Sequence, residues 1–132
     1  MNSRIKHVLD SSAILAVMAG EPGQELVQPL LVTAAITAVN ACEVISKLIS
    51  RNMSPDEAIG GLLRLEVEVA AFESALAFEA ARLLPLTRTL GLSLGDRACL
   101  AFARFYNVPA VTADRAWKKL ASKLSVDIRV IR

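Results

Sequence analysis

Short apolar runs alternate along the chain with longer segments in which apolar residues recur every three or four positions. The runs are typical of strands buried on both faces, and the longer segments are typical of amphipathic helices. We predict strands at about residues 5–9, 32–37, 66–71, 109–112 and 127–131. We predict helices at about residues 13–19, 24–30, 38–51, 73–84, 94–106 and 114–123, with one more that begins after Ser54. This alternation indicates an α/β fold with a mostly parallel sheet of about five strands, covered by helices on both faces.

Two local patterns indicate how particular helices begin. Ser54, Pro55 and Glu57 have the order of an N-cap, a first helical residue and the partner that closes a capping box. Ser93 and Asp96 have the same three-residue offset before an apolar helical repeat. The residues of that repeat that we expect to face the core are Leu94, Ala98, Ala101, Phe102 and Phe105.

Composition narrows the class of protein. A chain of 132 residues suits a single domain, residues 1–132, and 54% hydrophobic residues argue against disorder. Aromatic residues make up only 5%, which argues against a sheet that binds RNA by stacking bases on aromatic side chains. The apolar runs are far shorter than the roughly 20 residues of a membrane span, and the first residues lack the pattern of a signal peptide. We therefore expect a cytoplasmic protein with no membrane partner.

The cysteine and histidine residues do not suggest a metal site of their own. Cys42 and Cys99 have no CxxC spacing and are expected to be buried free thiols, and the single histidine, His7, lies in a predicted strand. A zinc site is therefore not expected. Because no glycine-rich phosphate loop follows the first strand, we also expect no nucleotide cofactor.

Charge is distributed unevenly along the chain. Residues 97–132 carry eight basic and two acidic side chains, although the net charge of the whole chain is only +2. The asymmetry suggests a polyanionic partner, but a solvated helix face would produce the same pattern.

Four acidic residues stand near the ends of predicted elements. Asp10 and Asp114 follow the first and fourth strands, while Glu43 and Asp96 lie early in helices. Each has an ordinary structural explanation. Asp10 and Asp114 are good helix N-caps, Asp96 fits a capping box, and Glu43 is placed to pair with Lys47.

Taken together, the four acids also predict a metal site. The carboxyl ends of parallel strands lie at one edge of a sheet, where ligands bind in α/β proteins. Like charges about 4 Å apart repel by about 4 kcal/mol at an effective dielectric constant of about 20, so a cluster of acids needs a cation. Oxygen ligands without soft donors favour Mg²⁺ or Mn²⁺, ions that commonly serve phosphoryl chemistry.

These acids lie in segments that resemble a known family, the PIN-domain ribonucleases, and more closely the VapC toxins of bacterial toxin–antitoxin (VapBC) pairs. The resemblance runs from Val8 to about Ile131 and is carried by VLDSSAILAVMAGEPG, TAVNACEVISKL, GLSLGDRACLAFA and VPAVTADRAWKKL. It implies a PIN-like three-layer sandwich and a metal-dependent ribonuclease that uses one or two Mg²⁺ or Mn²⁺ ions. The matching catalytic residues are Asp10, Glu43, Asp96 and Asp114.

The resemblance also implies a role for each of these residues and their neighbours. Asp10, Asp96 and Asp114 would hold the metal, and Glu43 would be a further ligand or would orient the attacking water. The hydroxyl groups expected to donate hydrogen bonds to the acids or to metal-bound water belong to Ser11, Ser12 and Thr112. The two arginines that directly follow cluster acids, expected either to contact the RNA backbone or to pair with those acids, are Arg97 and Arg115.

The partners implied by the resemblance are an RNA substrate, a VapB-type antitoxin and a second copy of the chain in a homodimer. The antitoxin tail would lie along an apolar groove, for which the predicted helices at residues 13–19 and 38–51 provide material. It would place a basic side chain among the acids and so block the site.

Two other functions fit the same acids. A receiver-like signalling domain binds Mg²⁺ through acids at strand ends, but it expects adjacent acids after one strand and a lysine after a later one. This chain has Ser11 and Ser12 after Asp10, and Asp114 where the lysine would stand. A non-catalytic module could instead use the acids to bind a basic peptide.

Overall fold

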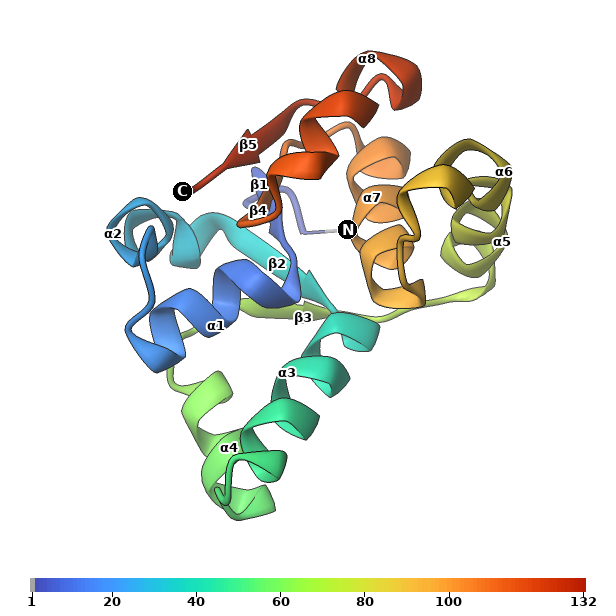
Figure 1. Ribbon diagram of the computed structural model, residues 1–132. Helices are drawn as coiled ribbons and strands as arrows, with labels where there is room; N and C mark the ends of the chain where they lie inside the picture. Colours follow the sequence, from blue (N-terminus) through green and yellow to red (C-terminus); the bar gives the residue numbers. More distant parts are fainter. Residues whose placement is uncertain (1) are drawn as a thin grey trace.

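The computed structural model describes residues 2–132 and shows a five-stranded sheet in which each strand is parallel to its neighbours (Figure 1). The strand order is β3-β2-β1-β4-β5, and the strands are β1 His7–Leu9, β2 Ala34–Thr37, β3 Glu68–Ala70, β4 Ala110–Thr112 and β5 Ile128–Val130. The predicted α/β fold is confirmed, although the strands are shorter than predicted. Because β2 and β4 flank the central β1, the segments that follow these three strands emerge side by side at one edge.

Helices cover both faces of the sheet, as predicted. The α-helices are α1 Ser11–Ala19, α2 Gln24–Val27, α3 Ala38–Ser50, α4 Pro55–Leu63, α5 Ser74–Arg82, α6 Leu84–Thr87, α7 Leu94–Tyr106 and α8 Ala121–Leu124. The 3₁₀ helices are η1 Gln28–Thr33, η2 Arg88–Leu90 and η3 Arg115–Leu120.

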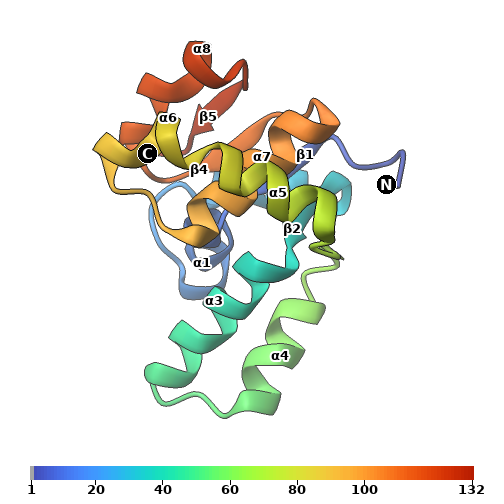
Figure 2. The same cartoon turned by 90° about the vertical axis from the view of Figure 1, so that its right-hand side faces the viewer.

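Two apolar cores lie on opposite faces of the sheet and define three layers. Val8 and Ala110 pack in one core with residues of α5, α7 and α8, whereas their neighbours Leu9 and Val111 pack in the other with residues of α1, α3 and α4. This alternation follows from the two-residue period of a strand. Figure 1 shows α1 and α5 on opposite sides of the sheet, and Figure 2 shows α5 lying across α7.

The prediction is wrong where short 3₁₀ helices replace regular elements. Residues 28–33 form η1, not the end of one helix and the start of a strand. Pro29 lies at its beginning and has no N–H to continue the α-helical hydrogen-bond ladder, so α2 ends at Val27. The helix predicted at 114–123 is likewise divided into η3 and α8.

Three side chains predicted to be buried are exposed. Cys42 lies off the stripe of α3 that Ala41, Val44 and Leu48 bury, so its thiol faces solvent. Leu94 and Phe105 are 56% and 51% exposed, and they lie in the first and last turns of α7. The burial predicted for Cys99 is confirmed.

The predicted helix starts are partly confirmed. Ser93 and Asp96 form the expected capping box at the start of α7. Ser54 accepts a hydrogen bond from the Glu57 N–H at 3.2 Å, but the exposed Glu57 side chain returns none to Ser54 in the described chain, so α4 has an N-cap without the full box. In residues 2–132, no helix is both long and apolar enough to cross a membrane.

Candidate functional site

Asp10 is the central residue of the site because it ends the central strand and begins α1. Its backbone N–H donates to the Val111 carbonyl at 3.0 Å, which continues the pairing of β1 with β4. Its side chain caps α1 by accepting a hydrogen bond from the Ala13 N–H at 2.9 Å. The side chain is only 4% exposed, so its carboxylate depends on the protein for its hydrogen bonds.

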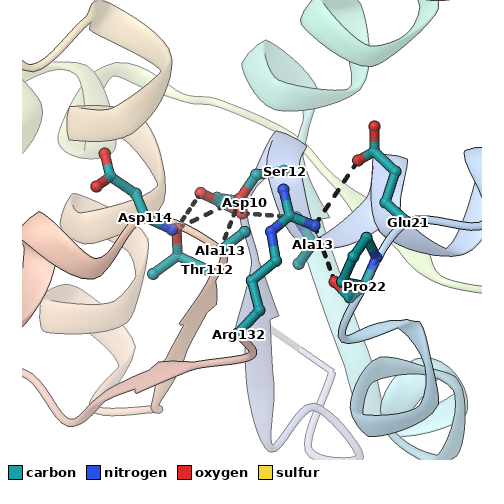
Figure 3. Close-up of polar contacts among 9 residues, drawn as sticks. All are labelled: Asp10, Ser12, Ala13, Glu21, Pro22, Thr112, Ala113, Asp114 and Arg132. Atoms are coloured by element: carbon teal, nitrogen blue, oxygen red, sulfur yellow. Dashed lines mark hydrogen bonds and ion pairs between the residues drawn. The ribbon is translucent and has the colours of Figure 1, made fainter.

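Two hydroxyl groups complete the surroundings of Asp10 (Figure 3). Ser12 Oγ donates to Asp10 Oδ1 at 2.7 Å, and the buried Thr112 Oγ1 donates to Oδ2 at 2.6 Å. The same hydroxyls accept hydrogen bonds from the chain that follows β4, with Ala113 N–H donating to Ser12 and Asp114 N–H donating to Thr112. Ser12 and Thr112 therefore fix the position of the Asp114 backbone relative to the Asp10 carboxylate.

Glu43 is held by a second group of hydrogen bonds. Its Oε1 accepts from Ser11 Oγ at 2.6 Å and from Asn40 Nδ2 at 3.1 Å. Glu43 is half-buried and forms no ion pair with Lys47 or any other residue among residues 2–132. The alternative that Glu43 pairs with Lys47 is therefore wrong, because Glu43 is directed toward the start of α1.

Asp96 and Asp114 combine helix capping with a place in the acidic cluster. Asp96 Oδ2 accepts from the Ser93 N–H at 3.0 Å, and Asp114 Oδ1 accepts from the Ala116 N–H at 2.9 Å at the start of η3. Asp96 is half-buried, whereas Asp114 is exposed. Both N-terminal helix positions favour a negative charge.

Asp96 lies within electrostatic reach of the three other acids. The pKa of Asp10 is raised to about 6, chiefly by burial, with a smaller upward contribution from Asp96; the three hydrogen bonds to Asp10 act in the opposite direction. Burial also raises the pKa of Asp96 against its hydrogen bonds from Ser93, and the charges of Glu43 and Asp114 raise it further. Asp96 is thus coupled to each of the other three acids.

Two residues of the site were missed by sequence reasoning. Asn40 is buried and joins Glu43 to α7, because its Nδ2 also donates to the Gly95 carbonyl at 3.0 Å. Cys99 lies one turn after Asp96, and burial raises the pKa of its thiol well above the usual value, with the charges of Asp10, Asp96 and Glu43 adding to the effect. A polar residue one helical turn before Glu43 was the available signal for Asn40.

The two predicted arginine contacts differ in their surroundings. Arg97 is half-buried, and its Nη1 donates to the Ala80 carbonyl of α5 at 3.0 Å. Arg115 is exposed, and its Nε donates to the carbonyl of Arg132, whose own guanidinium reaches the Pro22 carbonyl at 2.8 Å (Figure 3). In the described part of the chain, neither Arg97 nor Arg115 forms an ion pair with an acid, so the predicted pairing is wrong.

The oxygen donors of the site fit a hard divalent cation. Glu43 Oε2, Asp96 Oδ1 and Asp114 Oδ2 make no hydrogen bond to any residue from 2 to 132, and Asp10 Oδ2 accepts only one. Over the same residues, no three His, Cys, Asp or Glu side chains lie close enough together to form a preformed metal site made of protein ligands alone. Mg²⁺ retains several waters and commonly takes only one or two carboxylates, so this donor set suits it.

Comparison with known proteins identifies the fold family. A family model described as the PIN domain matches residues 7–123. Solved structures that are similar include one titled DNA-bound VapBC from Salmonella typhimurium, at 14% identity and a TM-score of 0.76, with 97% of this chain and 99% of that chain covered. VapBC-5 from Mycobacterium tuberculosis, described as a member of the VapBC family of toxin-antitoxin systems, has 22% identity and a TM-score of 0.63, with 95% and 98% covered. Curated protein sequences give no significant match.

The pKa of Asp10 predicts a dependence of stability on pH. Because its folded-state pKa of about 6 lies above the unfolded value of 3.8, the folded protein retains a proton that the unfolded chain loses. Stability is therefore lost as pH rises from about 4 through 6, and ionised Asp10 costs about 3 kcal/mol at pH 7. We expect the free energy of unfolding of Asp10→Asn, relative to wild type, to increase by most of this amount between pH 4 and pH 7.

The measurement is urea denaturation of both proteins in EDTA at several pH values. At each pH, the free energy of unfolding of the variant is compared with that of wild type. Any effect of the substitution that does not depend on pH then cancels between the pH 4 and pH 7 values. Equal differences at the two pH values would show that the Asp10 carboxylate is not held in the environment described here.

Proposed function

We propose that this chain, which belongs to the PIN domain family, is a divalent-metal-dependent ribonuclease that hydrolyses phosphodiester bonds. The observation that carries the proposal is that hydrogen bonds bring the four acids to one edge of the sheet. Thr112 bridges Asp10 and the Asp114 backbone, and Asn40 bridges Glu43 and the Gly95 carbonyl, next to Asp96. Burial and neighbouring negative charge disfavour the ionised forms of Asp10 and Asp96 unless a cation is bound. The oxygen donors and the lack of soft ligands favour Mg²⁺ or Mn²⁺, as one or two ions.

In this proposal the four acids have different roles. Asp10, Asp96 and Asp114 hold the metal, directly or through water, and Glu43 is a further ligand or orients the attacking water. When bound, the metal neutralises charge on the scissile phosphate and lowers the pKa of its bound water. Ser12 and Thr112 keep the Asp10 carboxylate in one orientation, and Ser11 does the same for Glu43.

A polyanionic substrate is consistent with the basic excess in the last third of the chain. The basic excess of residues 97–132 would attract a nucleic-acid backbone and offset its repulsion by the acidic cluster. Arg115 is the better placed of the two predicted arginine contacts, because it follows Asp114 and is exposed. The half-buried Arg97 donates to a backbone carbonyl of α5, which leaves less of its side chain for a substrate.

We further propose that the ribonuclease is the toxin of a toxin–antitoxin pair and is bound by a VapB-type antitoxin. The similar solved structures include VapBC complexes, which supports this assignment. A surface cavity of about 380 Å³ lies between α1 and the α3–α4 region and is lined by Met18, Met53, Glu57, Gly61, Arg64 and Leu65. In this groove Met18, Met53 and Leu65 would contact apolar side chains of an antitoxin segment, and Glu57 and Arg64 would contact its charged side chains. The homodimer implied by the resemblance also remains a proposal, which sedimentation equilibrium would test.

The receiver-like alternative is less well supported. A phospho-acceptor carboxylate must be open to a phosphoryl donor, but Asp10 is almost fully buried and both of its oxygens accept hydrogen bonds. A non-catalytic acidic module is distinguished from the ribonuclease by the activity experiment that follows.

We expect the purified protein to cleave single-stranded RNA in the presence of Mn²⁺ and to lose this activity in EDTA. Asp96→Asn and Asp114→Asn should each lower the cleavage rate by roughly 100-fold or more, because each removes charge that the metal requires. Asp127→Asn is a matched control, since this exposed acid precedes β5 at the opposite edge of the sheet. Cleavage that is independent of metal and equal in all variants would contradict the proposal.

The antitoxin groove gives a separate prediction. Met53→Arg should weaken binding of the antitoxin by roughly 10-fold or more, because it replaces an apolar contact with a longer, charged side chain beside Arg64, while leaving RNA cleavage unchanged. The measurement is co-purification and titration with a VapB-type antitoxin, taken from any short reading frame found directly upstream of this gene. Ser122→Arg adds the same charge at an exposed position of α8, in the opposite layer, and should have no effect. Equal binding by wild type and Met53→Arg would exclude this groove.

A further inference from the structure

The carboxylate of Glu43 occupies the space that a side chain on Gly95 would need. A Cβ built on Gly95 would collide with both carboxylate oxygens and with Cδ of Glu43. Gly95 is buried in the first turn of α7 and directly precedes Asp96. The contact therefore places the charged end of a residue from α3 against α7, beside a second acid of the cluster.

The backbone does not require glycine at this position. The residues with positive φ in the described chain do not include Gly95, so an alanine could adopt its conformation. Glycine is also less favourable than alanine within a helix, because it loses more backbone entropy on folding. Glycine at position 95 therefore leaves room that a Cβ would fill, and the Glu43 carboxylate occupies that room.

Hydrogen bonds from the elements around Gly95 hold Glu43 in this space. Asn40 Nδ2 donates both to Glu43 Oε1 and to the Gly95 carbonyl, at 3.1 and 3.0 Å. Asn40 Oδ1 in turn accepts from Thr37 Oγ1 at 2.6 Å, which fixes the orientation of the amide. Ser11 Oγ, at the start of α1, donates to the same Glu43 oxygen at 2.6 Å.

We propose that Gly95 and Asn40 are positioning residues that hold the Glu43 carboxylate in a preformed slot between α3 and α7. The inference rests on the proposed function, since it concerns how Glu43 is presented to a bound cation and its waters. A glutamate that is already fixed has less conformational entropy to lose when the site binds its ligand. The start of α7 also favours the negative charge that the slot brings there.

The first test is a thermodynamic cycle on thermal stability, measured without metal. Gly95→Ala should lower the melting temperature of the wild type, because the new methyl group displaces Glu43 and breaks its hydrogen bonds. In a Glu43→Ala background, the same Gly95→Ala change should raise the melting temperature, because only the helix preference of alanine remains. Gly60→Ala in α4 is a control, since its Cβ would meet only the mobile end of Arg64, at 3.3 Å, and it should be neutral or stabilising in both backgrounds.

The second test is titration with Mn²⁺ followed by electron paramagnetic resonance. Gly95→Ala and Asn40→Ala should each weaken Mn²⁺ binding by about 10-fold or more, as expected for residues that orient a ligand. Neither change should weaken Mn²⁺ binding further in the Glu43→Ala background. A residue that only supports the fold would lower affinity by the same factor in both backgrounds.

The outcomes separate this inference from the proposed function. The positioning role of Gly95 is wrong if Gly95→Ala raises the melting temperature of the wild type. It is also wrong if Gly95→Ala still weakens Mn²⁺ binding in the Glu43→Ala background. Either result stands even if the protein cleaves RNA. If wild type binds no Mn²⁺ and cleaves no RNA, the proposed function fails and the positioning role fails with it. A reversal of the stability effect in the Glu43→Ala background would then still establish the steric contact.

Discussion

The buried carboxylate of Asp10 is the constraint on which the rest of the site depends. It ends the central strand, caps α1 and accepts hydrogen bonds from Ser12 and Thr112, so it ties the chain after β1 to the chain after β4. These bonds only partly offset the cost of its burial, and the pKa of Asp10 remains raised to about 6. A site that keeps an acid under these conditions stabilises the charged form most effectively by binding a cation.

Helix capping and function are served by the same side chains. Asp10 and Asp114 accept hydrogen bonds from the first turns of the helices that they cap, and Asp96 accepts one from Ser93, the N-cap of α7. All three lie at the same edge of the sheet, where Asp96 is within electrostatic reach of Asp10, Glu43 and Asp114. The capping explanation that is available for each acid alone is therefore compatible with a shared metal site.

Much of this arrangement follows from local sequence patterns. The alternation of short apolar runs with amphipathic segments predicts a parallel sheet, and its carboxyl edge brings Asp10 and Asp114 together. Local patterns do not reveal contacts between α3 and α7, which belong to different layers and are far apart in sequence. For that reason the direction of Glu43, the role of Asn40 and the space left by Gly95 became visible only in the structure. The boundary errors at residues 28–33 have a different cause. The α and 3₁₀ conformations near Pro29 differ little in energy, so the sequence pattern does not show which of them forms.

The central claim is that the four acids form one cation site, and crystallography with manganese tests it most directly. An anomalous difference map of a crystal soaked in Mn²⁺ should show a peak in contact with the carboxylates of Asp10 and Asp96, directly or through ordered water. The Glu43 carboxylate should remain beside Gly95 in that structure. A map without a peak at this edge of the sheet, with the acids arranged as described here, would contradict the account and leave the carboxylates as helix caps.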